Sequence, residues 1–177
     1  MRALISVYNK EGIVEFAKEL RELGWEIIAS RGTAKILRKA KVKTKEVEEI
    51  NGFPPIFGGR LKTISPKIEG ALLFDRKNKK HQKEAKKFGI EPIDMVVCNF
   101  YPPEKGIDIG GPTMARAAAK NYKYVIVIVD PKDYPRVIDF LKRKGKVPLS
   151  FRLKLARKVF LKTARYDRAI LEFIGNK

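Results

Sequence analysis

The stretch "ALISVYNKEGIVEFAKELRELGWEIIAS" (residues 3–30) decides the fold of this chain. Residues 3–7 form an apolar run that is followed by polar residues and a glycine, which is typical of a buried strand entering a turn. Residues 12–24 carry apolar side chains at helical spacing and end on a glycine, and residues 25–30 predict a second strand. A strand, a helix and a second strand in this order predict a parallel β-α-β unit.

The same alternation continues along the chain. The patterns predict helices at 31–40, 77–89, 108–121 and 131–145, a weaker strand at 44–50, a short strand at 71–74, and buried strands at 94–100 and 124–130. Residues 51–70, rich in Gly and Pro and without a period, predict a long functional loop. Residues 149–175 predict a long amphipathic helix with at most one break.

These elements together predict an α/β fold, in which a parallel sheet is flanked by helices. We expect one α/β domain at 1–145. The remaining residues, 146–177, are expected to form a C-terminal helical extension that packs on the same domain or on a partner subunit.

The composition bounds the class of protein. A chain of 177 residues, 44% of them hydrophobic, is long enough for one globular domain with a sizeable core. No apolar run approaches the length of a membrane helix, and the N-terminus lacks the apolar stretch of a signal peptide, so we expect no membrane association. Cys98 is the single cysteine, which excludes an internal disulfide and favours the reducing cytoplasm.

The formal net charge of +19 allows three interpretations. Lysine and arginine neutralise phosphates, so the chain could bind nucleic acid or steer in a small phosphorylated ligand. The third interpretation is a surface rich in ions, typical of a thermophile. The basic residues are spread along the chain and are not clustered with aromatic residues, which favours the third interpretation for most of the charge and argues against a nucleic-acid partner.

Polar residues directly follow three of the predicted strands. These are Tyr8, Asn9 and Lys10, then the segment 30–33, and then the segment 99–101. Because ligands bind beyond the carboxyl ends of parallel strands, we expect these residues to meet at one edge of the sheet.

Two short motifs suggest anion or substrate binding, each with a plainer alternative. "SRGTA" (30–34) places small residues at a helix start, where backbone N–H groups favour an anion, although Ser30 or Thr33 could serve as an ordinary N-cap. "GGRLKT" (58–63) places Arg60 and Lys62 two residues apart, on one face of an extended segment, although a solvated loop is the alternative in so basic a chain.

Two further stretches carry polar groups near the same edge. "CNFYPP" (98–103) ends a buried strand with Asn99 and Tyr101, which can orient a polar ligand or simply anchor the strand terminus. "DIGGPTMARAAAKN" (108–121) opens with Asp108 and closes with Lys120. The two charges could meet at a substrate, or each could compensate one end of the helix dipole.

The sequence lacks the common cofactor and metal signatures. It contains no GxGxxG, Walker or GxSxG motif. With one cysteine and one histidine there is no cluster of metal ligands, and His81 among lysines predicts a solvated side chain.

Taken together, several long motifs resemble the IMP cyclohydrolase domain of the bifunctional purine-biosynthesis proteins. They are "SVYNKEGIVEFAKEL", "ASRGTAKIL", "EINGFPPIFGGRLKTISPKIEGALL", "IDMVVCNFYP", "IDIGGPTMARAAAKN" and "TARYD", in an order that runs nearly end to end. The resemblance implies a Rossmann-like fold similar to that of methylglyoxal synthase. It also implies dehydrative closure of a formamido-imidazole-carboxamide ribotide to IMP, by a cytoplasmic homodimer that needs no metal or cofactor. The folate-dependent formyltransferase domain has no counterpart in the sequence, so a separate formyl-transferring protein is expected to supply the substrate.

The resemblance also implies roles for individual residues. Lys62 and Tyr101 would stabilise the oxyanion and help expel it as water, while Asp108 and Lys120 would manage the proton of the attacking nitrogen. Other residues would bind the substrate: the 5′-phosphate would lie at Lys10, Ser30, Arg31, Gly32 and Thr33, and the base at Arg60, Thr63 and Asn99. The candidate substrate-binding set also includes Tyr8, Asn9, Ile109, Gly110 and Cys98, although Cys98 inside an apolar run is typical of inert core.

The sequence departs from the family pattern at several positions. Arg31 stands where glycine is usual and Tyr8 where serine is usual, which alters the phosphate end. Ser65 and Tyr122 replace histidines, and the loop before Asp108 is short. Three alternatives remain open: a related phosphate-ligand domain, either methylglyoxal synthase or a regulatory nucleotide-binding module; a nucleic-acid-binding protein; and an inactive paralogue.

Overall fold

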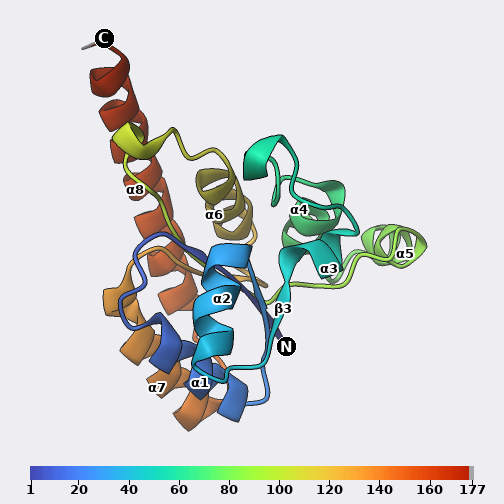
Figure 1. Ribbon diagram of the computed structural model, residues 1–177. Helices are drawn as coiled ribbons and strands as arrows, with labels where there is room; N and C mark the ends of the chain where they lie inside the picture. Colours follow the sequence, from blue (N-terminus) through green and yellow to red (C-terminus); the bar gives the residue numbers. More distant parts are fainter. Residues whose placement is uncertain (176–177) are drawn as a thin grey trace.

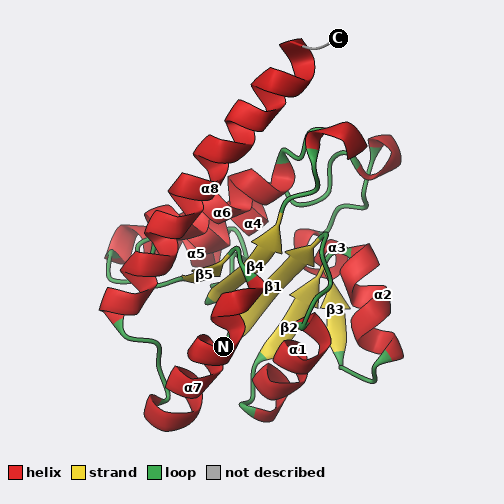
Figure 2. Ribbon diagram, turned by 90° about the vertical axis from the view of Figure 1, so that its left-hand side faces the viewer, coloured by secondary structure: helices red, strands yellow, loops and turns green. Residues whose placement is uncertain are grey.

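The computed structural model describes residues 1–175 and contains a five-stranded, wholly parallel sheet. The strand order is β3-β2-β1-β4-β5, and Figure 2 shows the sheet at the centre of the molecule. The strands are β1 (Arg2–Val7), β2 (Glu26–Ala29), β3 (Thr44–Glu46), β4 (Met95–Asn99) and β5 (Ile126–Ile128). The α/β class predicted from the sequence is confirmed.

Helices cover both faces of this sheet. They are α1 (Ile13–Glu22), α2 (Arg31–Lys39), α3 (Val47–Asn51), α4 (Pro66–Leu73), α5 (Lys79–Lys87), α6 (Gly110–Lys120), α7 (Tyr134–Lys144) and α8 (Leu149–Gly175), with short 3-10 turns η1 (Phe57–Gly59), η2 (Pro103–Lys105) and η3 (Pro131–Asp133). Helix α1 packs against α2 and α7, and α6 packs against α4 and α8. The sheet lies between these two groups (Figure 2), whereas α5 lies at the periphery (Figure 1).

The two central strands carry the core and fix the place of the site. Leu4, Ile5 and Val96 are fully buried, as expected for strands covered on both faces. Strands β1 and β4 pair in register from Ala3 with Met95 to Val7 with Asn99, so they end at the same level. The strand order reverses direction between them, and this switch point is where parallel sheets bind ligands.

Three segments differ from the sequence prediction. The expected strand at 71–74 belongs to helix α4, because Ser65 caps that helix by accepting from the Ile68 N–H and Pro66 occupies its first turn. The expected strand at 44–50 ends at Glu46, where a capping box starts helix α3. The expected loop at 51–70 is therefore irregular only between these two helices.

The C-terminal helix is longer and more regular than the sequence required. Helix α8 runs unbroken through 27 residues, so the break allowed by the pattern is absent. Its first half packs on α6 and β5 of the same domain, and its last turns extend away from the body (Figure 1). Within residues 1–175, no helix combines the length and apolar character needed to cross a membrane.

Glu69 on helix α4 predicts a measurable dependence of stability on pH. Its Oε1 is buried and has no hydrogen-bond partner among the described residues, and burial raises the pKa of its carboxyl from 4.5 to about 7. The folded state therefore holds the proton more tightly, so its stability falls as the pH rises through this window.

We expect Glu69→Gln to stabilise the protein by about 1 kcal/mol near pH 8 and to change little near pH 4, after discounting the shift for partial solvent screening. Urea unfolding at both pH values measures this difference. Glu84→Gln on the exposed helix α5 is the matched control and is expected to change stability little at either pH. An equal effect of Glu69→Gln at both pH values would contradict the argument.

Candidate active site

A cavity of about 450 Å³ opens beyond the carboxyl ends of the central strands. Its size suits a small ligand. The expected site residues that line it are Tyr8, Lys10, Ser30, Gly32, Thr33, Arg60, Lys62, Thr63, Asn99, Tyr101, Asp108, Ile109 and Gly110. The structure thus brings together residues from segments at 8–10, 30–33, 60–63, 99–101 and 108–110.

The amide of Asn99 holds the loop that follows β1. Its Oδ1 accepts from the backbone N–H groups of Tyr8, at 2.6 Å, and Asn9, at 2.8 Å. Its Nδ2 donates to the Asn9 carbonyl at 2.9 Å. Asn99 therefore shapes one wall of the cavity through the backbone of this loop, and these bonds engage both ends of the amide that the sequence assigned to the substrate base.

The start of helix α2 presents free donors to the cavity. Ser30 stands at the N-cap position, but no side chain caps this helix. The Ser30 hydroxyl pairs instead with that of Ser6, at 3.0 Å, and the Thr33 hydroxyl accepts from the Val7 N–H at 3.3 Å. The ordinary N-cap alternative for "SRGTA" is thus not realised. The Thr33 N–H donates to the Ser30 carbonyl at 2.8 Å, which leaves the N–H groups of Arg31 and Gly32 as the free donors at a helix start where the dipole favours an anion.

Two lysines add positive charge to this end of the cavity. The Lys10 ammonium donates to the Thr33 hydroxyl at 3.2 Å and also to the carbonyl of Val7. Burial, together with the nearby charge of Lys62, lowers the pKa of Lys10. An anion bound between the two ammonium groups would reduce their mutual repulsion. The helix start and the two lysines therefore form one anion-binding region.

The segment before α4 supplies Arg60, Lys62 and Thr63 to the cavity. Its chain turns sharply through three consecutive residues with positive φ: Phe57 at 53°, Gly58 at 66° and Gly59 at 88°. This turn, followed by an isolated bridge between Ile56 and Leu61, brings both basic side chains of "GGRLKT" to the same cavity. Both side chains line the cavity, but Arg60 has helical backbone angles, so the extended segment that the sequence argument assumed is absent.

Asp108 lies at the opening of helix α6. Its Oδ1 accepts from the Gly111 N–H at 2.8 Å. Burial raises the pKa of Asp108, against the opposing effects of the Gly111 and Tyr101 backbone groups and the Lys62 charge. A carboxylate whose pKa is raised by burial is a stronger base than one in water, so Asp108 is suited to accept a proton.

Tyr101 lies opposite Asp108 in the same loop region. Its hydroxyl donates to the Ile107 carbonyl at 3.3 Å, and its ring lies 6.2 Å from the ring of Tyr8. Burial, followed by the charge of Asp108, raises the pKa of Tyr101 and keeps the phenol protonated. The cavity therefore pairs a basic carboxylate with a phenolic donor and the Lys62 ammonium.

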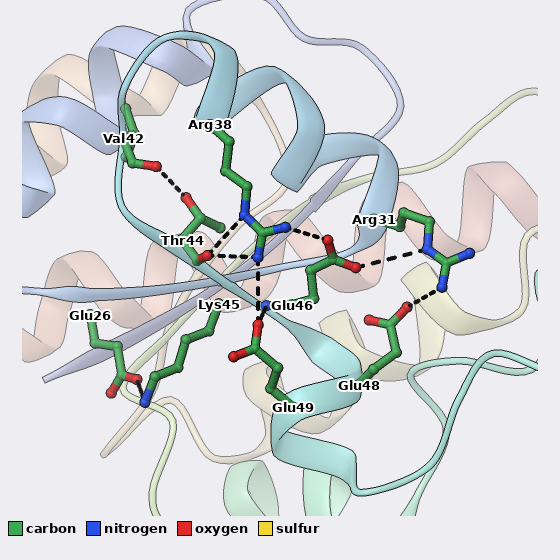
Figure 3. A network of polar contacts seen from close by, with 9 residues as sticks. All are labelled: Glu26, Arg31, Arg38, Val42, Thr44, Lys45, Glu46, Glu48 and Glu49. Carbon is green, nitrogen blue, oxygen red and sulfur yellow. Dashed lines mark hydrogen bonds and ion pairs between the residues drawn. The ribbon is translucent and has the colours of Figure 1, made fainter.

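The side chain of Arg31 does not line this cavity. Its guanidinium forms ion pairs with Glu46, at 3.8 Å, and Glu48, at 3.4 Å, as Figure 3 shows. It lines a neighbouring hollow beyond the turn at 58–59. The acidic start of α3 attracts the side chain away from the anion-binding region, so the expectation that Arg31 contributes its charge to a phosphate in this cavity is corrected, and only its backbone N–H at the start of α2 is left for that role.

The same network in Figure 3 joins α2 to β3 and α3. Arg38 forms an ion pair with Glu46 at 2.5 Å and donates twice to the Thr44 carbonyl. Arg31 extends this network toward the cavity rim. The extra positive charge that the sequence places at the phosphate end is therefore neutralised within the chain itself.

Lys120 lies far from Asp108 within one chain. It is exposed at the C-terminal end of α6, ten residues after the helix begins, and does not line the cavity. At the rise of an α-helix those ten residues span about 15 Å, and the side chain recovers only part of that distance. The expectation that these two charges meet at one substrate therefore fails for a single chain.

Two other expected residues also lie outside the cavity lining. Cys98 is fully buried with its Sγ 3.8 Å from the Gly111 carbonyl, which supports the inert-core interpretation. Asn9 is exposed, and its side chain accepts from the Glu11 N–H at 3.0 Å in a turn. Each is next in sequence to a cavity residue, but the Cys98 side chain is buried in the core and the Asn9 side chain is engaged in the turn.

Sequence reasoning missed several lining residues, namely Ser6, Val7, Gly59, Ile64, Ile107, Gly111 and Met114. Ser6 and Val7 belong to the end of the first strand, and Met114 lies one turn into α6. In the sequence, Gly111 could have been found from its place close to Asp108 at the predicted helix start. In the structure, a Cβ at this position would come within 2.8 Å of the Asp108 carboxylate.

His81 is less solvated than the sequence suggested. It is half-buried, and its Nδ1 accepts the Asp75 N–H at 3.0 Å. Among the described residues, no group of three or more His, Cys, Asp or Glu side chains is arranged to hold a metal ion.

Comparisons with known proteins find related sequences and a similar fold. Residues 12–122 match the model of the MGS-like domain, and residues 118–177 match that of the AICARFT/IMPCHase bienzyme. The bifunctional purine biosynthesis protein PurH of Persephonella marina is 50% identical over 99% of this chain, and that of Aquifex aeolicus is 50% identical over 96%. A structure titled "Crystal structure of ForH" is 34% identical, with a TM-score of 0.91 over 98% of both chains. The present chain spans only 37% of the length of the Persephonella protein.

Proposed function

This chain belongs to the MGS-like domain family and corresponds to the IMPCHase-like part of the PurH proteins, and on that premise we propose that it is an enzyme of purine biosynthesis, an IMP cyclohydrolase. Its substrate is 5-formamido-1-(5-phosphoribosyl)imidazole-4-carboxamide, whose ring closes to IMP with loss of water. The observation that carries the proposal is one cavity in which Asp108, Tyr101 and Lys62 lie beside an anion-binding region at the start of α2.

The substrate's two ends match the two parts of the cavity. Its 5′-phosphate binds the free N–H groups of the first turn of α2, with Lys10 and Thr33 beside them. The base then lies toward Asp108 and Tyr101. Because both reacting groups are on one ring, holding the phosphate and the base already supplies much of the rate.

The cavity residues supply the proton transfers that ring closure needs. The carboxamide nitrogen attacks the formyl carbon and forms the new C–N bond, while the formyl oxygen takes the negative charge. Lys62 and Tyr101 stabilise this oxygen and give it two protons as the C–O bond breaks and water leaves, while the formamide nitrogen loses its proton and the C=N bond of the new ring forms. Asp108, made more basic by its burial, accepts a proton from the attacking nitrogen.

The direct test is to mix the pure protein with the formamido ribotide and follow the ultraviolet change as IMP forms. Catalysed conversion that disappears in Lys62→Ala supports the proposal. If the wild type shows no conversion yet binds IMP, the alternative function is favoured, namely a phosphate-ligand-binding regulatory domain or an inactive paralogue of the same fold.

Lys120 remains part of this proposal only as a residue of a second copy. The resemblance assigns it a proton-transfer role, but its place at the far end of α6 keeps it out of the cavity of its own chain. A homodimer in which α6 of one copy approaches the cavity of the other would allow Lys120 to act in proton transfer although it lies outside the cavity of its own chain. The dimer, like the separate formyl-transferring protein, stays a prediction.

We therefore expect Lys120→Ala to lower turnover at least about tenfold, as loss of a proton-transfer group does. A mixture of Lys120→Ala with Lys62→Ala is then expected to recover about one quarter of wild-type activity, because half of the randomly paired symmetric dimers are mixed and each contains one intact site. Recovery measured after equal mixing and dissociation tests the point. Full activity of Lys120→Ala alone would remove this residue from the mechanism.

A further inference from the structure

The "TARYD" motif places Tyr166 of helix α8 beneath the candidate site. Tyr166 is buried, and its hydroxyl accepts the backbone N–H of Asp108 at 2.8 Å. The same hydroxyl donates to the backbone carbonyl of Tyr101 at 2.9 Å. One phenol therefore joins the two ends of the segment 101–108, which carries both residues to which the proposed reaction assigns proton transfers.

The hydroxyl is the only part of Tyr166 that can close this loop. A phenol donates one hydrogen bond and accepts others, so it satisfies a carbonyl and an N–H at the same time. Removing it leaves both backbone groups unpaired in a half-buried place, which costs more than the bonds themselves contribute. The residues between 101 and 108 are mostly exposed and form only the short turn η2.

The tyrosine ring is itself held firmly. It packs on Phe100, the residue before Tyr101, with ring centroids 5.3 Å apart. The ammonium of Lys162, on the same helix, lies over the Phe100 ring at 5.9 Å from its centre. It also donates a hydrogen bond to the Val129 carbonyl. Thr163 accepts from Arg116 of α6 at 3.3 Å. These contacts, one turn before Tyr166, fix helix α8 to the end of the sheet and to α6.

We propose that Tyr166 is a positioning residue, through which helix α8 fixes the distance between Asp108 and Tyr101. The proposal rests on the proposed ring closure and deepens it. Tyr166 acts through the backbone of the loop and does not line the cavity. Helix α8 therefore positions the two proton-transfer residues in addition to covering the sheet.

The test compares Tyr166→Phe with Tyr134→Phe. Both remove one hydroxyl from a buried tyrosine and keep the ring. Tyr134 stacks on Phe16 between α1 and α7, away from the cavity, so it controls for a purely structural loss. Thermal unfolding of both variants measures the stability change, which is expected to be larger for Tyr166→Phe because its hydroxyl makes two hydrogen bonds to the backbone.

In the ring-closure assay, Tyr166→Phe is expected to lower kcat about 10- to 100-fold, as a misplacement of catalytic groups does. The KM is expected to change less than about threefold, because the phosphate is held by segments that Tyr166 does not touch. The acidic limb of the pH profile is also expected to move to lower pH, since water that enters the loosened loop reduces the effect of burial on Asp108. Tyr134→Phe is expected to keep wild-type kcat, KM and pH profile.

A second measurement needs no substrate and separates this proposal from the proposed function. Amide hydrogen exchange of residues 101–108 is expected to accelerate at least about tenfold in Tyr166→Phe and to stay at the wild-type rate in Tyr134→Phe. An unchanged exchange rate overturns the positioning role, whatever the activity. If the wild type shows no turnover but the exchange rate still responds to Tyr166→Phe, the ring-closure function is refuted. The role of Tyr166 in holding the segment 101–108 is then retained.

Discussion

Asp108→Asn is expected to lower turnover about 100- to 10,000-fold, the range that a lost general base produces. The amide keeps the shape of the side chain, and its oxygen can still accept the Gly111 N–H, so the opening of α6 is preserved. What it removes is the basic carboxylate beside Lys62 and Tyr101. Initial rates of IMP formation from the formamido ribotide measure the effect.

The same variant is expected to keep or slightly raise the melting temperature at neutral pH. The pKa of Asp108 is raised chiefly by burial, so the charged carboxylate costs folding free energy above its ordinary pKa, and the neutral amide avoids that cost. Asp139→Asn on α7, which loses a charge paired with Arg136 and Arg143, is the matched control with unchanged turnover. Near-normal turnover of Asp108→Asn would remove Asp108 from the mechanism.

Gly111→Ala is expected to lower turnover about 100-fold without unfolding the protein. A Cβ built on Gly111 lies 2.8 Å from Asp108 Oδ2, closer than real contacts allow, and 3.1 Å from Phe100 Cδ1, which is tighter than most real contacts. The carboxylate is the more easily displaced of the two neighbours, and a shift of about 1 Å is enough to cost two orders of magnitude. The better helix propensity of alanine, about 1 kcal/mol, offsets part of the strain.

Gly70→Ala in helix α4 is the control for this variant. Its Cβ would come within 2.9 Å of Ile90 Cδ1, the far end of a flexible apolar side chain that can move away. Both variants thus place a methyl group into a tight contact inside a helix, but only Gly111→Ala displaces a cavity residue. IMP binding is expected to persist in both, because the phosphate is held elsewhere. Equal rates for the two variants would show that the position of Asp108 is not critical.

The edge of the sheet that carries the site was predictable from the sequence, for a general reason. Polar residues after three apolar runs must gather where parallel strands end, whatever the details of packing. This placed Lys10, Thr33 and Tyr101 correctly at the cavity. The site roles of Lys62 and Asp108 came only from the resemblance to the family, since the local pattern of each also fitted a solvated loop or a helix terminus.

Local patterns were insufficient where a short segment allowed two structures. The short apolar run 71–74 fits either a strand or a buried helix. Only the Ser65 cap and the packing of α4 on α6 decide in favour of the helix. The single unbroken helix at 149–175 likewise depends on the surface it packs on, formed by α6 and β5.

By itself, the sequence determined the alternation of strands and helices, the parallel sheet and the segments that surround the cavity, because periodicity and turn residues act over a few neighbours along the chain. The tertiary structure alone decided that Arg31 turns to Glu48, that Asn99 holds the loop after β1, and that Tyr166 spans Tyr101 and Asp108. The physical reason is that each of these outcomes is a hydrogen bond or ion pair between segments far apart in sequence, whose energy exists only once the sheet has brought them within reach of one another.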